Sequence, residues 1–340
     1  MKRNLLLLIV LFSCVAARSQ DLTFSQFYEQ PLLRNPALAG VFTGDLRVSM
    51  AYRDQWGSIT VPFRTSSLSI EHKIPIGQHN DVVTIGTQMT MDVAGDIHLK
   101  RTQVMPVINF HKSLDEEKDT YLSLAFMGGA VSSQFDATQL KMGDQYVGGS
   151  FNAANPTAQT FSATGYSYWD LSTGLCFSTA FNKDTRFYIA AGLSHFLKPT
   201  IKSLATTSNA DFLASRISFN VGVSGTMGER GRYIGFADYM MQNGNRQALA
   251  GALLGLQVTE YDNEEAPVVY IGSFIRWGDA VIPVVKMDMS HVSIGISYDV
   301  NVSKLNVASN WRGGLEVTAS YRGFLKIRNS TLDKLRCVRF

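Results

Sequence analysis

Few side chains in this sequence have the types and spacing that catalysis or metal binding requires. The histidines lie scattered, with no pair at the spacing of metal ligands on one helix and no Cys-x-x-Cys motif. They are His72, His79, His98, His111, His195 and His291. The glycine-rich run Gly222–Gly228 lacks both the dinucleotide spacing and the Lys-Ser/Thr ending of a phosphate loop. We therefore expect no catalytic residue, no cofactor and no metal site, and we predict that the protein is not an enzyme.

A different pattern runs along nearly the whole chain, in which apolar residues alternate with small or polar ones. Between Thr84 and Met91, isoleucine and methionine fall on one parity, and glycine, glutamine and two threonines on the other. The stretch from Val292 to Asn301 repeats this alternation. Because successive strand side chains point to opposite faces, one face suits hydrocarbon and the other suits water. The pattern is typical of a membrane-spanning β-barrel, and a soluble β-sandwich is the alternative on alternation alone.

Residues 1–19 have the form of a secretory signal peptide. Lys2 and Arg3 precede the apolar run Leu5–Phe12, and a small-residue cleavage site ends at Ser19. Once Lys2, Arg3 and Arg18 are removed, the 31 basic residues fall to 28 and equal the 28 acidic ones. A chain without a basic excess gives no support to nucleic-acid binding. We expect an exported protein, and no later run of apolar residues approaches the ~18 that a membrane helix needs.

Fourteen segments combine the alternation with the length of about ten residues that a tilted strand needs to cross a bilayer. They are 45–54, 63–74, 82–92, 99–111, 120–132, 167–180, 186–197, 214–226, 231–240, 247–259, 267–277, 281–289, 291–300 and 313–322. The two longest connections, Gln134–Tyr166 and Lys198–Leu213, both follow odd-numbered segments. Outer-membrane barrels alternate short periplasmic turns with longer external loops in this way. We predict an all-β fold, a transmembrane antiparallel β-barrel of about 14 strands, with counts of 12 to 16 compatible with the pattern.

Two features leave open how the lumen of such a barrel is filled. The loop Gln134–Tyr166 is rich in Gly, Asn, Ser and Thr, and it is an external binding loop, an inward-folded plug or a simple flexible loop. Charged residues on the polar parity should line the lumen, either as a solvated interior or as a ring of paired charges that closes the pore. They are Glu71, Lys73, Asp170, Lys286, Asp288, Glu316 and Arg322.

Motifs at both ends of the chain are more specific than the alternation. Near the start come Asp21-Leu-Thr-Phe24-Ser-Gln26, then Asn35-Pro-Ala-Leu-Ala-Gly40 and Tyr52-Arg-Asp-Gln-Trp56. Near the end come Arg276-Trp-Gly-Asp-Ala-Val-Ile-Pro283, then Ser297-Tyr-Asp-Val-Asn301 and Arg312-Gly-Gly-Leu-Glu316. With these motifs in this order, the chain resembles the PorP/SprF family of outer-membrane proteins, which is associated with type IX secretion in Bacteroidetes.

The resemblance implies an outer-membrane component of the type IX secretion or gliding machinery. Such a protein anchors a cognate, adhesin-like surface protein or assists its export, and it contacts periplasmic and lipoprotein subunits of the machine. The motif residues are candidates for partner binding or for a structural role. They are Phe24, Gln26, Phe27, Asn35, Pro36, Gly40, Tyr52, Arg53, Gln55, Trp56, Arg276, Trp277, Asp279, Pro283, Tyr298, Asp299 and Asn301. An outer-membrane diffusion channel or small-solute transporter is the alternative function.

We accordingly divide the chain into four parts. Residues 1–19 are the signal peptide, 20–44 a periplasmic or plug segment, 45–322 the outer-membrane barrel and 323–340 a basic periplasmic tail. In the second part, Pro36 restricts Asn35 to extended geometry at a turn, and Gly40 permits a tight bend into the first strand. This segment is either a strap that packs in or under the barrel or a direct partner contact.

Overall fold

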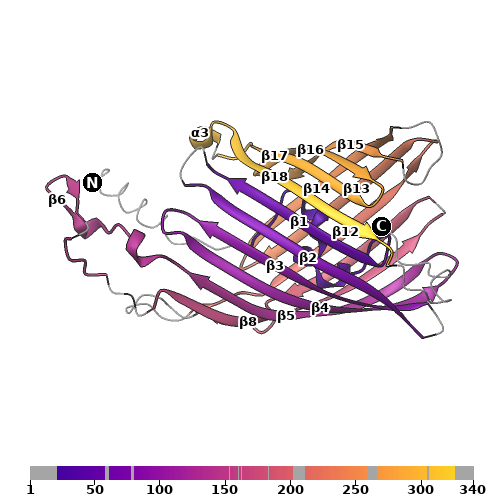
Figure 1. Ribbon diagram of the computed structural model, residues 1–340, viewed down its shortest axis with the longest axis horizontal. Helices are drawn as coiled ribbons and strands as arrows, with labels where there is room; N and C mark the ends of the chain where they lie inside the picture. Colours follow the sequence, from indigo (N-terminus) through magenta and orange to yellow (C-terminus); the bar gives the residue numbers. More distant parts are fainter. Residues whose placement is uncertain are drawn as a thin grey trace, which may run out of the picture.

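Fourteen long antiparallel strands close into one barrel in the computed structural model (Figure 1). They are β1 (Leu46–Gln55), β2 (Phe63–Ile76), β3 (Asp81–Ala94), β4 (Leu99–Asp115), β5 (Thr120–Gln134), β8 (Gly165–Ala180), β9 (Arg186–Ser194), β12 (Arg216–Met227), β13 (Gly231–Gln242), β14 (Asn245–Gln257), β15 (Val268–Arg276), β16 (Ala280–Met289), β17 (Val292–Asn301) and β18 (Arg312–Gly323). Each strand pairs with its neighbours in chain order, and β1 pairs with β18 to close the barrel. The predicted fold and strand count are confirmed.

The structure describes residues 21–57, 61–77, 80–152, 154–159, 161, 163–182, 184–201, 211–258, 266–304 and 306–325. The predicted signal peptide and all but the first three residues of the predicted C-terminal tail lie outside these ranges.

The alternation read from the sequence determines which side chains face outward. On β3, Ile85 and Met89 are 44% and 39% exposed, whereas Thr84 and Gln88 on the other parity are fully buried. A row of exposed apolar side chains on a barrel wall is suited to lipid, and the buried polar row points into the lumen. The charges predicted to line the lumen follow the same rule, since Glu71, for example, is fully buried.

Residues 21–45, which we name the luminal segment, run through the barrel ahead of the first strand. The segment contains three short helices, η1 (Phe27–Glu29), α2 (Pro31–Arg34) and η2 (Pro36–Leu38). Its start lies at the end of the barrel that carries the long loops, where Asp21 contacts Arg216 at the beginning of β12. Its last residue, Asp45, lies at the opposite end and accepts hydrogen bonds from the backbone of Leu325. The segment therefore spans the lumen from the long-loop end to the short-turn end.

One side of the lumen is apolar rather than polar. Phe27 and Tyr28 of the luminal segment pack into a cluster with inward-facing side chains of β14, β15 and β16, among them Leu253, Phe274 and Ile282. The Phe27 and Phe274 rings meet edge to face with centroids 5.3 Å apart. These strands carry apolar residues on both parities because they face lipid on one side and the luminal segment on the other.

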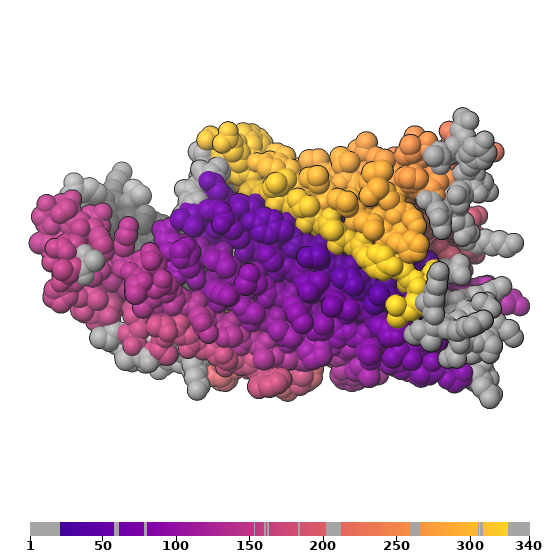
Figure 2. All heavy atoms as spheres, in the orientation of Figure 1, coloured from indigo at the N-terminus to yellow at the C-terminus, as the bar shows by residue number. Residues whose placement is uncertain are grey.

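The connections at the two ends differ as predicted. The longest, after β5, contains η3 (Ala137–Gln139), η4 (Gly143–Gln145) and the two-stranded β6 (Tyr146–Val147) and β7 (Ser150–Phe151). It extends away from the barrel rather than folding into it (Figures 1 and 2). The same end holds the pair β10 (Thr200–Ile201) and β11 (Asp211–Phe212) and the helix α3 (Asn306–Ser309). Longer loops mark the external side of outer-membrane barrels, so the long-loop end is the outer one.

Candidate functional site at the luminal segment

The Phe-Ser-Gln motif is bound by a buried carboxylate of the last strand. Glu316 of β18 is 1% exposed, and its two oxygens accept the backbone N–H groups of Ser25 and Gln26 at 2.7 and 2.6 Å. The Gln26 side chain continues the pairing, since its Oε1 accepts the Thr318 hydroxyl at 2.8 Å. Hydrogen bonds to a charged acceptor are roughly twice as strong as neutral ones. This contact fastens the start of the luminal segment to the strand that closes the barrel.

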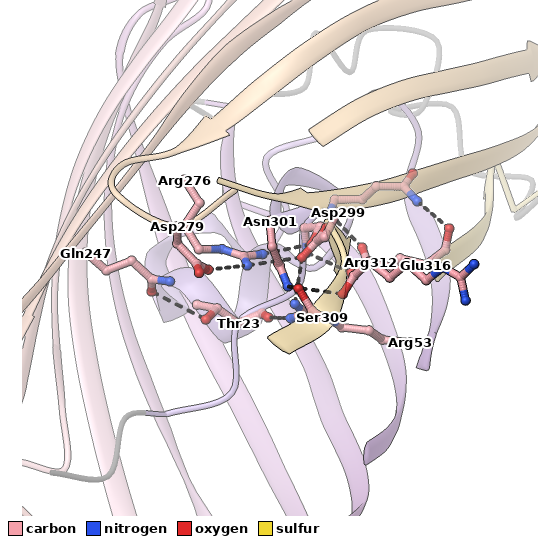
Figure 3. A network of polar contacts seen from close by, with 12 residues as sticks. Thr23, Arg53, Gln247, Arg276, Asp279, Asp299, Asn301, Ser309, Arg312 and Glu316 are labelled. Carbon is pink, nitrogen blue, oxygen red and sulfur yellow. Dashed lines mark hydrogen bonds and ion pairs between the residues drawn. The ribbon is translucent and has the colours of Figure 1, made fainter. Parts of the chain in front are cut away.

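A second buried carboxylate, Asp299 of β17, binds two arginines (Figure 3) and also accepts a hydrogen bond from the Ser25 hydroxyl of the motif. Arg53 of β1 donates to Asp299 at 2.9 Å, and Arg276 of β15 donates to the same oxygen at 3.1 Å. Arg276 also donates to the Ser25 hydroxyl at 2.8 Å, and Arg53 donates to the backbone carbonyl of Thr23. The network therefore joins the luminal segment to β1, β15 and β17.

Midway along the segment, Arg34 at the end of α2 makes a two-pronged ion pair with Asp238 of β13. Its Nε donates to one carboxylate oxygen at 2.7 Å and its Nη2 to the other, while Nη1 donates to the Tyr188 hydroxyl at 2.9 Å. The guanidinium also lies over the Phe27 ring, 5.0 Å from its centroid. Arg34 is 4% exposed, so this pair is shielded from water.

The Asn-Pro-Ala-x-Ala-Gly motif forms the turn at the inner end. Asn35 is extended, and its side chain caps η2 by accepting the Ala37 N–H at 2.9 Å. Gly40 has φ +80, and an added Cβ would lie 2.1 Å from the Thr84 hydroxyl oxygen, so only glycine fits. Its N–H donates to Glu71 at 2.9 Å, and Glu71 also pairs with Arg47.

At the outer end, Asp21 contacts side chains from β4, from β12 and from the residue that follows β9. His195, which directly follows β9, lies between Asp170 and Asp21, with 2.6 Å to each carboxylate. Arg216 approaches Asp21 to 3.1 Å and Arg101 to 3.9 Å. Burial alone would lower the pKa of His195, but the hydrogen bonds to Asp170 and Asp21 outweigh it and raise that pKa to about 9. Burial would raise the pKa of Asp21, yet Arg216 and His195 hold it well below its usual range.

A cavity of about 500 Å³ lies above this region, at the mouth of the long-loop end. Its floor is the luminal segment from Asp21 to Phe24, and its walls are the outer ends of the strands. We name it the mouth cavity. Its wall includes side chains of Arg53, Gln55, Trp56, Phe63, Asp92, Arg101, Ser133, Tyr166, Tyr168, Gln247, Arg276 and Asp279.

The residues predicted as candidates fall into three groups. Ten are buried in the luminal segment or on the inner side of the barrel wall, namely Phe24, Gln26, Phe27, Asn35, Pro36, Gly40, Arg53, Arg276, Asp299 and Asn301. Gln55, Trp56 and Asp279 line the mouth cavity. Four lie on the outside of the barrel, away from the others: Tyr52, Trp277, Pro283 and Tyr298.

The structure brings several residues into the same site that were not predicted as candidates. Glu316, Asp238 and Asp170 are buried acids on the polar parity of their strands, and that parity is the signal that marks them. Arg34 and His195 lie outside the strands, so no alternation identifies them. Among the described residues, no group of three or more His, Cys, Asp or Glu side chains could hold a metal ion.

Comparison with known proteins places the chain in a family. The model of the type IX secretion system membrane protein PorP/SprF matches residues 16–321. None of the functionally curated proteins matches the sequence. The described residues contain no helix long and apolar enough to cross a membrane.

Solved outer-membrane barrels are similar to this chain at low sequence identity. The toluene transporter TodX of Pseudomonas putida is 8% identical, with a TM-score of 0.50 over 85% of this chain and 92% of its own. A FadL homologue of Pseudomonas aeruginosa is 10% identical, with a TM-score of 0.46 over 84% and 92%. The family match over nearly the whole chain and the closed 14-strand barrel agree, and the chain belongs to the PorP/SprF family of type IX secretion outer-membrane proteins.

Proposed function

We propose that this barrel is a closed outer-membrane anchor of the type IX secretion or gliding machinery. Its long-loop end holds a secreted, adhesin-like surface protein or assists its export, and its short-turn end contacts periplasmic and lipoprotein subunits. The observation that carries this proposal is the luminal segment, which spans the barrel from Asp21 to Asp45 and is fastened at its start, middle and end. A plugged barrel suits recognition and tethering better than diffusion.

The competing function is a channel for small solutes. TodX, which shares the fold, is described as a toluene transporter. Here a pathway through the lumen would require the luminal segment to leave its buried ion pair with Asp238 and its hydrogen bonds to Asp299 and Glu316. A buried ion pair that loses one partner typically destabilises the fold by about 3–5 kcal/mol. The number of such contacts favours a segment that stays in place.

The connection after β5 supports a partner site at the outer end. It extends beyond the barrel, and its β6–β7 hairpin leaves Tyr146 and Val147 61% and 63% exposed (Figure 1). These neighbouring apolar side chains have no packing role in the barrel wall or the lumen, and adjacent exposed apolar residues are the kind of surface that a protein partner covers. We therefore assign the contact with the exported protein to this loop.

The test is mass spectrometry of proteins that co-purify with an epitope-tagged copy from the native outer membrane in mild detergent. We expect a stoichiometric surface protein together with periplasmic lipoproteins. A variant in which a Gly-Ser linker replaces residues 137–160 should lose the surface protein and keep the lipoproteins. A matched variant with a changed turn at residues 116–118, at the opposite end, should keep the surface protein.

A barrel that purifies alone in its wild-type form would contradict the anchor proposal. Single-channel recordings then decide the competing function, because a transporter conducts without removal of the luminal segment. A closed wild-type barrel that also lacks partners would reject both functions.

A further inference from the structure

The mouth cavity is lined by aromatic, charged and amide side chains, to which the anchor proposal gives no role. Six consecutive strands of the barrel, in the order β1, β2, β3, β4, β5 and β8, contribute one continuous arc of its wall. A volume of about 500 Å³ lies within the range of roughly 300–1,000 Å³ that small-molecule sites occupy. The cavity lies at the outer, long-loop end of the barrel, above the luminal segment.

Aromatic rings stand at both ends of this arc. At the β1–β2 end, the Trp56 and Phe63 rings meet with centroids 5.0 Å apart. Trp56 has φ +62, an unusual conformation for a bulky side chain, and its backbone N–H is fixed to the Gly313 carbonyl at 3.0 Å. At the other end, Tyr166 and Tyr168 stack with centroids 6.2 Å apart. The two pairs provide aromatic ring surface on either side of a polar stretch.

The polar stretch between them combines donors and acceptors. Asp92 and Arg101 lie directly opposite each other on β3 and β4. Arg101 has five N–H donors, and the hydrogen bond found for it is one to the Tyr168 hydroxyl at 3.2 Å, with Asp21 3.9 Å away. The lining as a whole contains three arginines and three aspartates, so it is neutral. An ionic ligand of either sign would meet repulsion from half of these charges.

We propose that the mouth cavity binds a short oligosaccharide. A sugar ring presents C–H faces that pack on the electron-rich faces of aromatic rings, and hydroxyl groups that both donate and accept. The neutral mixture of guanidinium, carboxylate and amide groups satisfies both kinds of hydrogen bond. A hydrocarbon would shield the polar side chains of the lining from water and offer them no hydrogen bond in return. An extended peptide would find no free edge on the barrel strands of the wall, because each of them is paired on both sides.

The experiment uses the full mature protein folded in lauryldimethylamine oxide, a detergent without a sugar headgroup. Fluorescently labelled protein is applied to a microarray of bacterial surface glycans, and the glycan with the strongest signal is titrated by calorimetry. We expect saturable binding that falls at least tenfold in Trp56→Ala and in Tyr168→Ala. Arg101→Met should weaken binding to a similar extent. Heat-modifiable gel mobility shows that each variant retains a folded barrel.

Trp277→Ala is the matched control, because Trp277 is 81% exposed at the same end of the barrel and does not line the cavity. Its affinity should equal that of the wild type. The proposal is overturned if no glycan binds, if Trp56→Ala and Tyr168→Ala both bind like the wild type, or if a neutral pentapeptide or toluene binds the cavity in place of a glycan. The anchor proposal is tested by co-purification and does not depend on this outcome.

Discussion

The ion pair between Arg34 and Asp238 is the residue-scale contact that the luminal segment depends on most directly. Both side chains are shielded, with exposures of 4% and 0%. We predict that Asp238→Asn lowers the free energy of unfolding by about 3–5 kcal/mol, because it leaves a buried guanidinium without its counter-charge. The shift is measured as the midpoint of urea unfolding, followed by gel mobility of the folded barrel.

The exposed pair of Arg64 and Asp54 provides the control for this measurement. Its side chains are 60% and 34% exposed, so Asp54→Asn should change stability by about 0–1 kcal/mol. The double variant Arg34→Met with Asp238→Leu should recover most of the loss, since apolar side chains can replace a buried pair. An Asp238→Asn barrel as stable as Asp54→Asn would show that the pair is not what holds α2 in place.

His195 gives the outer end of the luminal segment a dependence on pH. Its pKa rises from 6.5 to about 9 on folding, so its ion pairs with Asp170 and Asp21 stabilise the fold fully below pH 6.5. This contribution is lost as pH rises through about 9. Arg216 and Arg101 continue to hold Asp21. We predict that hydrogen exchange of the backbone near Asp21 becomes faster between pH 6.5 and 9, beyond the intrinsic increase.

His195→Gln isolates the imidazole from the other titrating groups. In that variant the protection near Asp21, corrected for intrinsic exchange, should be lower at pH 6 and should no longer change up to pH 9. Protection around Arg34, which lies deeper in the lumen, should be the same in both proteins. A wild-type profile that is flat over this range would mean that His195 does not retain its charge in the fold.

The residues of the site differ in how far the sequence reveals them. Glycine and proline have distinctive backbone conformations that can be predicted from the residue type alone. Gly40 and Pro36 occupy the tight turn that these conformations predict. Arg53 and Asp299 lie in recognisable motifs, but their contact joins positions 246 apart in the chain, and a strand pattern does not say which residues of distant strands meet. Arg34 lies in a helix of four residues, where no periodicity indicates its direction.

Among the elements, the strands were predictable, whereas the sequence left open whether residues 20–44 fill the lumen or lie beneath the barrel. Each strand has its own alternation, which is a local property. β16 shows the limit, because Ile282 and Val284 are buried while Val281 and Val285 on the other parity are exposed. Apolar residues on both faces indicate that something apolar fills the lumen there, and only the three-dimensional arrangement identifies it as Phe27 and Tyr28.

The luminal segment as an element is expected to keep the pore shut. We predict that deletion of residues 21–42 turns a barrel with negligible conductance into an open one, measured by single-channel recording in planar bilayers. The reason is that the segment occupies the lumen from Asp21 to Phe42, while the strands form a closed ring of hydrogen bonds without it. Folding of the deletion variant is checked by gel mobility.

A point variant within the luminal segment separates loss of packing from loss of the segment itself. Phe27→Ala empties part of the apolar cluster but leaves the Glu316 and Asp238 contacts in place, and large-to-small changes of this kind cost about 3–5 kcal/mol. It should lower stability and leave the barrel closed. A deletion variant that folds and stays closed would show that the lumen is blocked by something other than the luminal segment.

At the scale of the whole molecule, the path of the luminal segment fixes which face of the membrane each end of the described chain meets. Asp21 lies at the long-loop end beside the mouth cavity, whereas Leu325 lies at the short-turn end beside Asp45. Because long loops face outward, we predict that an epitope with a flexible linker inserted directly before Asp21 is labelled by antibody on intact cells. The same epitope after Leu325 should be labelled only after the outer membrane is permeabilised.

This pair of tags tests the threading itself, since a segment that packed beneath the barrel would place both epitopes in the periplasm. A tag within residues 137–160 serves as the external reference and should be labelled on intact cells at a comparable level.

The threading also constrains assembly. The segment precedes β1 and is bound by Glu316 of β18, the strand that pairs with β1 to close the ring. We therefore expect the luminal segment to assist closure of the ring, so weakening the Glu316 contact by Glu316→Gln should slow the appearance of the folded gel band more than Asp54→Asn does.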